Sequence, residues 1–172
     1  MRAIWFPMTL FVALHGACTP PSPQALTETQ RESLQTEVRA VVSELTAAMN
    51  SHDPDRLFSL YRESEDFVYM GCTDPLFGFE SFSARVGPYY RANPDVVFQQ
   101  EILQLQILSA TSAVVTLQGA STEADALFWT EVLVREDDGR WLIAHEHESW
   151  PGCPGPKPLH PTGTFDPSGG GL

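Results

Sequence analysis

The side chains with the clearest chemical potential lie near the C-terminal end of the chain, in the sequence His145-Glu146-His147-Glu148. Imidazole groups titrate near neutral pH, so either histidine could act as a general base or acid on a small ligand. A His-x-His pair can also hold a metal ion, with Glu131, Glu146 or Glu148 as a third ligand. The strands that carry these groups decide which chemistry is available.

Residues 127–150 predict a β-hairpin, because two runs rich in Val, Leu, Ile and Trp flank an Asp-Asp-Gly turn. If Glu136 faces Gly139 and both strands alternate strictly, the more apolar face should look into the core. Together with Tyr69, that face is expected to line a ligand pocket with Phe128, Thr130, Val132, Trp141, Ile143, His145 and His147. The opposite face, expected to contact a second subunit, carries Trp129, Leu133, Leu142 and Ala144.

This register leaves His145, His147 and Tyr69 as the candidate catalytic groups, none of them firm, with ligand contact or pocket lining as the alternative role. The glutamates of the cluster and Glu131 would project from the opposite face, so no metal site is predicted. No Ser-His-Asp order, phosphate loop or nucleotide fingerprint is present, and no cofactor is predicted.

The first 17 residues have the features of a bacterial targeting segment. Arg2 precedes an apolar run that is too short to span a bilayer, and small residues precede Cys18. This pattern resembles a lipoprotein signal, although His15 stands where Leu is usual. We therefore expect a signal peptide at 1–17, a lipid on Cys18, a tether at 18–28, and a location in the bacterial cell envelope, either lipid-anchored or exported to the periplasm.

The composition limits the partners. The chain has 172 residues and a formal net charge of −12, with Lys157 as its only lysine. Such a charge disfavours a nucleic-acid surface. An exported chain also lies in an oxidising compartment, so we expect Cys72 and Cys153 to form a disulfide. The Pro/Gly-rich tail, 151–172, is expected to be disordered.

The order of elements indicates an α+β domain. Amphipathic spacing and capping patterns predict helices, and alternation predicts strands. The expected helices are 27–51, 54–61 and 80–91, and the expected strands before the hairpin are 66–72, 76–79, 96–108 and 111–119. We expect about three helices on the concave face of a curved, mostly antiparallel sheet.

Four stretches carry a resemblance to a known family: NSHDPDRLFSLY, DFVYMG, the Gly78-Phe-Glu entry to the third helix, and DDGRWLIAHEHES. Over residues 29–150 the chain resembles the nuclear transport factor 2-like superfamily, in its SnoaL-like, ketosteroid-isomerase-like branch. The resemblance implies a cone with an internal pocket and often a homodimer through the outer sheet face. The superfamily includes isomerases, dehydratases and non-catalytic binding modules, so its fold does not fix a function.

Three functions follow as hypotheses. The first is a cell-envelope lipoprotein whose domain binds a small, partly apolar ligand or a partner protein without catalysis. The second is a pocket enzyme, an isomerase or dehydratase, with His145 or His147 as its base. Ketosteroid isomerases need an inward carboxylate base, and no aspartate of the chain clearly fills that role. The third is a non-catalytic dimer or assembly module.

Overall fold

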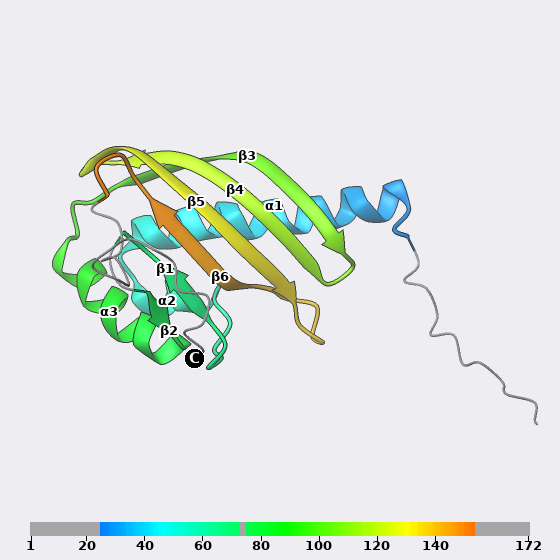
Figure 1. Ribbon diagram of the computed structural model, residues 1–172, viewed down its shortest axis with the longest axis horizontal. Helices are drawn as coiled ribbons and strands as arrows, with labels where there is room; N and C mark the ends of the chain where they lie inside the picture. Colours follow the sequence, from blue (N-terminus) through cyan, green and yellow to red (C-terminus); the bar gives the residue numbers. More distant parts are fainter. Residues whose placement is uncertain (1–24, 73–74, 154–172) are drawn as a thin grey trace, which may run out of the picture.

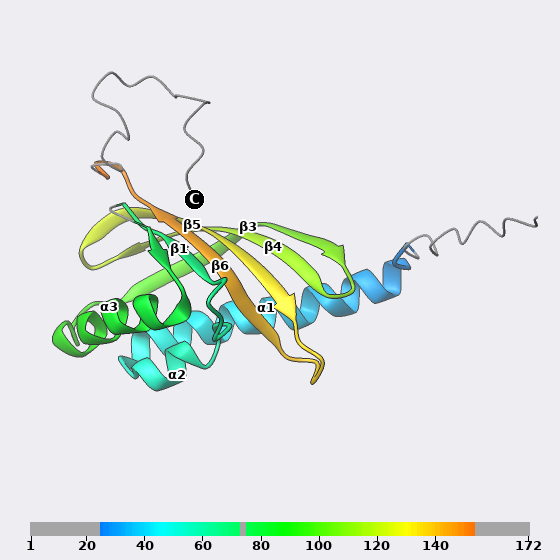
Figure 2. The same ribbon diagram turned by 60° about the horizontal axis from the view of Figure 1, so that its bottom comes forward.

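A computed structural model describes residues 25–72 and 75–153. This part of the chain contains three helices and a six-stranded sheet with the strand order β2-β1-β6-β5-β4-β3 (Figure 1). Neighbouring strands are antiparallel except for β1 and β6, which are parallel. Figure 2 shows the helices together on one side of the curved sheet. The predicted α+β class is confirmed.

Helix α1, Glu28–Ser51, runs along the concave face of the sheet (Figure 1). Thr27 begins it with a capping box, in which the Thr27 hydroxyl accepts from the Gln30 amide at 3.2 Å and the Gln30 side chain accepts from the Thr27 amide at 2.9 Å. The buried stripe of the helix consists of Leu34, Val38, Val42, Leu45, Ala48 and Met49. This stripe forms much of the core beneath the sheet.

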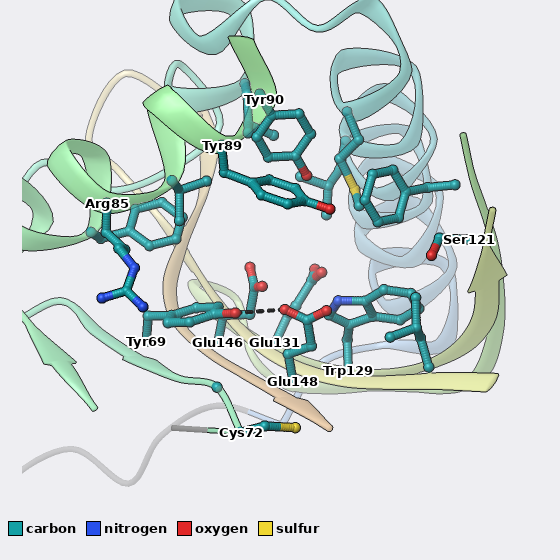
Figure 3. Close-up of a pocket in the computed structure, with 18 of the residues that line it drawn as sticks. Tyr69, Cys72, Arg85, Tyr89, Tyr90, Ser121, Trp129, Glu131, Glu146 and Glu148 are labelled. Atoms are coloured by element: carbon teal, nitrogen blue, oxygen red, sulfur yellow. Dashed lines mark hydrogen bonds between the residues drawn. The ribbon is translucent and has the colours of Figure 1, made fainter. Parts of the chain in front are cut away.

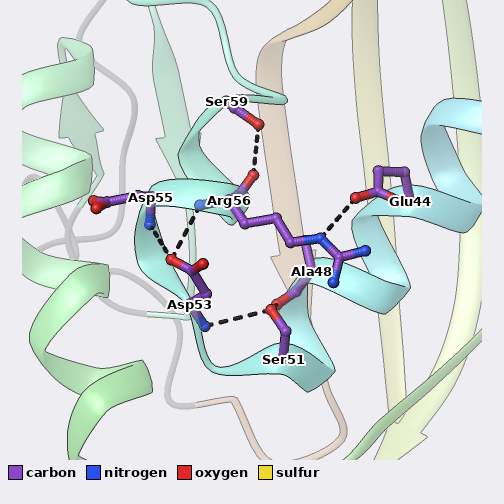
Figure 4. A network of polar contacts seen from close by, with 7 residues as sticks. All are labelled: Glu44, Ala48, Ser51, Asp53, Asp55, Arg56 and Ser59. Carbon is purple, nitrogen blue, oxygen red and sulfur yellow. Dashed lines mark hydrogen bonds and ion pairs between the residues drawn. The ribbon is translucent and has the colours of Figure 1, made fainter.

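Helix α2, Pro54–Phe58, is short and is fixed by its N-cap (Figure 4). The Asp53 carboxylate accepts from the backbone amides of Asp55 and Arg56 at 3.0 and 3.3 Å. Arg56 also pairs with Glu44 of α1 at 2.8 Å, but both side chains are exposed and such a pair adds little stability. The cap therefore determines where α2 starts and how the chain delivers Tyr61, just beyond it, to the interior.

Strands β1, Val68–Met70, and β2, Leu76–Phe77, lead into helix α3, Phe79–Ala92. Phe82 of α3 lies at the centre of an aromatic cluster, with ring centroids 4.8 Å from Tyr61, 5.0 Å from Phe67 and 5.3 Å from Tyr69. The cluster holds α3 against the chain around β1, and it positions two tyrosines that reach the functional site.

The long strands are β3, Phe98–Ser109, β4, Ser112–Ser121, β5, Ala124–Arg135, and β6, Trp141–Ser149. They bend over α1 in Figure 1. Within the bend, a Cβ at Gly119 would lie 1.8 Å from the carbonyl oxygen of Gln99, so only glycine allows the two strands to approach this closely.

The β5–β6 hairpin forms as predicted, but its register near the turn differs from the expected one by one residue. Gly139 adopts a positive φ of 86°, and its amide donates to the carbonyl oxygen of Glu136 at 2.9 Å. This left-handed glycine adds a residue to the turn, so Arg135 pairs with Trp141. Odd-numbered residues of both strands consequently share the interior face at this end of the hairpin.

A β-bulge in β6 changes the register a second time. Leu133 pairs with Ile143, whereas the preceding Val132 pairs with His145, and Ala144 is left as the extra residue. An extra residue reverses the alternation of the strand beyond it. Trp141 and Ile143 are therefore buried as predicted, but after the bulge Glu146 is buried and His147 is exposed.

These two shifts overturn the predicted division of the hairpin into faces. Trp129 and Leu133, expected at a subunit interface, are buried in the interior. Leu142 pairs with Val134 at the other end of β6, and Ala144 is the bulged residue. The homodimer stays a prediction, which sedimentation velocity tests. At this part of the hairpin, the outer sheet face carries the row of Val114, Val132 and His145 in place of the predicted residues.

A cysteine pair joins two parts of the domain that lie far apart in the sequence. A disulfide links Cys72 to Cys153, with the Cα atoms 5.1 Å apart, so the segment after β1 is tied to the segment after β6. Within the described ranges, no helix is both long and apolar enough to cross a membrane. The predicted leader, Cys18 and the tail beyond residue 153 lie outside the described residues, and the lipid anchor stays a prediction.

The bulge predicts that deletion of Ala144 is tolerated. Removing the extra residue leaves Ile143 and Glu146 on the interior face with regular alternation between them. Urea unfolding should show a loss of about 1–2 kcal/mol in the free energy of unfolding.

Deletion of Thr130 is the matched control, since β5 has regular pairing on both sides at this position. This deletion should reverse the faces of β5 and unfold the domain, or cost more than about 4 kcal/mol. Equal damage from the two deletions would show that β6 carries no bulge.

Candidate functional site

A cavity of about 670 Å³ lies between the concave face of the sheet and the helices. It receives side chains from all three helices and from every strand. Figure 3 shows three glutamates side by side at one end, with Tyr89 and Tyr90 of α3 across the open space. The size and enclosure are those of a site for a small molecule.

The glutamates come from neighbouring positions of the central hairpin. Glu131 of β5 pairs directly with Glu146 of β6, and Glu148 follows two residues later on the same face. Glu131 is fully buried and Glu146 is 5% exposed. Both glutamates of β6 face inward only because the bulge at Ala144 reverses the alternation of that strand.

Two of the three carboxylates are held by tyrosines. The Tyr61 hydroxyl donates to Oε2 of Glu146, and the Tyr69 hydroxyl donates to Oε2 of Glu148, each at 2.6 Å. Tyr61 is placed by a bridge between its backbone and that of Ile143, and Tyr69 lies in β1, which pairs with β6. Each tyrosine thus lies in a segment adjacent to the strand whose carboxylate it binds.

The third carboxylate has no such partner. Neither Oε1 nor Oε2 of Glu131 has a hydrogen bond to any of the described residues, although both atoms are inaccessible to solvent. A buried polar group without a hydrogen bond is costly and uncommon in a folded protein, and it is more costly when it is charged.

Burial dominates the protonation of the site. It raises the pKa of Glu131 well above its ordinary value, and the neighbouring Glu146 raises it further. Burial and the charge of Glu148 raise the pKa of Glu146 to about 8, against the lowering effect of the Tyr61 hydrogen bond. Burial also raises the pKa of Glu148, which the hydrogen bond from Tyr69 lowers in part. Near neutral pH the group therefore holds protons that ordinary glutamates would release.

The rest of the cavity is mostly apolar and aromatic. Its walls include Leu45, Met49, Leu57, Phe82, Tyr90, Phe98, Leu127 and Trp129. At the rim, the Tyr89 hydroxyl donates to Glu123 at 2.8 Å, and the exposed Arg85 lies beside Tyr69 in Figure 3. The site thus combines an acidic end with an apolar body.

The structure places the predicted pocket residues on different surfaces. Tyr69 lines the cavity. Trp141 and Ile143 are buried but do not line it, and the Trp141 indole donates to Glu37 at 3.0 Å. Phe128, Thr130, Val132, His145 and His147 lie on the outer face of the hairpin, away from the cavity. The histidines therefore do not line this cavity, contrary to the expectation.

Sequence reasoning placed Glu131, Glu146 and Glu148 on the opposite face and gave no role to Tyr61, although all four form the acidic end. One signal for Glu131 was available, because Trp129, Glu131 and Leu133 alternate and two of the three are large apolar residues. For the β6 glutamates there was no such signal, since no residue type predicts the bulge at Ala144.

Among the described residues, no group of three His, Cys, Asp or Glu side chains is arranged to hold a metal ion.

A profile of the SnoaL-like domain matches residues 38–152, which is more than half of the chain. The chain belongs to the SnoaL-like family. A search of curated proteins finds no match for it. The family assignment agrees with the resemblance recognised in the sequence and covers every residue of the acidic end.

Solved structures similar to this SnoaL-like domain share its nuclear transport factor 2-like fold. An NTF-2 like protein of unknown function from Shewanella oneidensis MR-1 is 19% identical with a TM-score of 0.57, over 67% of this chain and 98% of that one. A ketosteroid isomerase-like protein from Erwinia carotovora atroseptica is 19% identical with a TM-score of 0.52, over 67% and 94%. A cystatin-like fold protein from Burkholderia xenovorans is 15% identical with a TM-score of 0.59, over 70% and 94%. These identities establish the fold alone.

The raised pKa values predict that the SnoaL-like domain loses stability as the pH rises from 5 to 8. In this range the unfolded chain has released the proton of Glu146, whose ordinary pKa is 4.5, while the folded chain retains it up to about pH 8. Proton binding thus favours the folded state at pH 5, and this contribution disappears as the pH passes through the folded pKa.

Glu146→Gln should flatten the decline between pH 5 and pH 8 by on the order of 2 kcal/mol in the free energy of unfolding, measured with urea at each pH. Glu63→Gln, at an exposed position outside the cavity, should leave the decline unchanged. Parallel curves for Glu146→Gln and the wild type would contradict the proposed protonation of the site.

Proposed function

We propose that this SnoaL-like domain binds a small, partly apolar molecule in the cavity, with the polar part of the molecule at Glu131, Glu146 and Glu148. The observation that carries the proposal is the pair of unpartnered carboxylate oxygens of Glu131 at the end of a cavity of about 670 Å³. A domain that only needed a packed core would fill this space with apolar side chains, as in other protein interiors.

A second unpartnered group supports the same proposal. Gln100 lines the cavity, and its Oε1 accepts from the Thr46 hydroxyl at 2.8 Å. That bond fixes the amide, while its Nε2 is buried without a partner among the described residues. A ligand with a donor for Glu131 and an acceptor for Gln100 would satisfy both groups, and the apolar walls would bury its body.

Proton-transfer catalysis is the second candidate, and one observation favours it. Burial and Glu148 raise the pKa of Glu146 to about 8, where a carboxyl group can exchange protons with a substrate near neutral pH. The base of an isomerase or dehydratase would then be Glu146, oriented by Tyr61, in place of His145 or His147.

The expected location of the protein follows first from its N-terminal sequence. A lipid-anchored protein of the bacterial cell envelope remains the expectation, and a ligand would then reach the cavity from outside the cytoplasm. The disulfide between Cys72 and Cys153 supports this expectation, because such bonds persist in oxidising compartments.

Ligand-observed NMR with a library of small, partly apolar fragments tests the binding function. We expect several fragments to bind the wild type with millimolar or tighter dissociation constants. Ala124→Phe places a benzyl group in the cavity, which Ala124 lines, and it should weaken these fragments at least tenfold.

Ala47→Phe on the exposed side of α1 is the matched control and should bind like the wild type. Failure of every fragment to bind, or equal binding by Ala124→Phe, would overturn the binding function.

The same samples in deuterium oxide test catalysis. Uptake of deuterium at the carbon next to a fragment carbonyl, if it disappears in Glu146→Gln, would establish proton transfer. Binding without uptake would exclude proton transfer for those fragments.

A further inference from the structure

Resting on the proposed binding function, we infer that the ligand is an organic cation: a protonated amine on an aromatic or aliphatic body, with its ammonium group at Glu131, Glu146 and Glu148. Three features of the cavity favour a cation: the excess of acidic over basic side chains, the absence of hydrogen-bond donors to Glu131 among the described residues, and the aromatic walls.

The ionisable groups that line the cavity are mostly acidic, and Glu131, Glu146 and Glu148 become negative when a bound cation displaces their protons. Four carboxylates line it, those of Glu123, Glu131, Glu146 and Glu148, against the single guanidinium group of Arg85 among the described residues. Arg85 is exposed and lies beside Tyr69 at one edge in Figure 3, so solvent screens its charge. The three glutamates of β5 and β6 lie deeper, where the lower dielectric strengthens their effect on a bound charge. An anionic ligand is therefore disfavoured and a cation is favoured.

The hydrogen bonds of the acidic end point the same way. Tyr61 and Tyr69 each supply one donor to Glu146 and Glu148, and Glu131 receives none from the described residues. Ionised carboxylates accept several hydrogen bonds, so this end of the cavity has many free acceptors. A protonated primary amine brings three N–H donors together with the opposite charge, whereas a hydroxyl group brings only one donor and no charge.

The aromatic residues suit the body of the same ligand. Trp129 lies beside Glu148 in Figure 3, and Tyr89 and Tyr90 lie across the cavity from the glutamates. Aromatic faces attract a cation, and they also pack against the apolar groups that carry it. Carboxylates and aromatic rings around one space are thus complementary to both parts of an organic amine.

A neutral ligand is the competing occupant. The cavity could accept one with a proton retained on Glu131, since burial raises the pKa of that carboxyl. The two cases differ in proton linkage. A cation that binds at the glutamates should displace protons into the buffer, whereas a neutral ligand should bind without net proton release.

Isothermal titration calorimetry at pH 7.5 with three related probes separates these cases. The probes are 2-phenylethylammonium, 2-phenylethanol and 3-phenylpropanoate, which share a benzyl body and carry a positive, zero and negative charge. We expect the ammonium probe to bind at least tenfold more tightly than the alcohol, with measurable proton release in buffers of different ionisation enthalpy. The propanoate should bind more weakly than the alcohol.

Glu131→Gln should reduce the preference for the ammonium over the alcohol to threefold or less. Glu63→Gln, the exposed control, should keep the full preference. Glu148→Gln provides a second variant at the same end of the cavity, should Glu131→Gln not fold, and it should lower the preference at least threefold.

Equal or tighter binding of the alcohol would overturn the cation inference while leaving the binding function intact. A preference that survives both Glu131→Gln and Glu148→Gln would also overturn it, because the cation would then lie elsewhere. Failure of all three probes to bind would overturn the inference too, and the fragment screen with Ala124→Phe would then decide separately whether the cavity binds any ligand.

Discussion

The desolvation of three carboxylates at one end of an apolar cavity is the constraint on which the rest of this structure depends. Glu131, Glu146 and Glu148 are taken out of water by the helices that close over the concave sheet. Only two of them receive a tyrosine hydroxyl in return. Burying charged groups is unfavourable unless they are paired or hold a proton. The raised pKa values of all three groups lower this cost, because the carboxyl groups retain protons. A suitable ligand would relieve the remaining cost.

The surrounding elements can be understood as the means of holding this arrangement. The bulge at Ala144 turns Glu146 and Glu148 inward, and the parallel pairing of β1 with β6 brings Tyr69 to Glu148. The N-cap at Asp53 fixes α2, from which the chain continues to Tyr61. Phe82 packs against both tyrosines and holds α3 over the cavity. A rigid aromatic cluster and a capped helix therefore orient the two hydroxyl donors.

Much of the fold followed from the sequence, because helix amphipathicity, capping and strand alternation are local and strong. The capping box at Thr27, the cap at Asp53 and the hairpin after Leu127 needed no tertiary information. The site did not follow, because it depends on two single-residue shifts. The left-handed Gly139 and the extra Ala144 each shift which side chains of the hairpin face the interior. As a result, the glutamates of β6 face the cavity in place of the histidines that were expected there. Tyr69 was predicted correctly as a cavity residue because it lies outside the hairpin, so the wrong hairpin register did not affect its placement. Tyr61 could not be found, because its hydrogen-bond partner Glu146 lies 85 residues further along the chain.

The central claim, that Glu131, Glu146 and Glu148 are buried together in the cavity, is tested most directly by ¹³C NMR titration of the assigned glutamate carboxyl groups. The account predicts that all three titrate above the ordinary value of 4.5, with Glu146 near pH 8. Titration of all three groups at that ordinary value would show that they face solvent, and it would contradict the bulge, the acidic site and the ligand assigned to it.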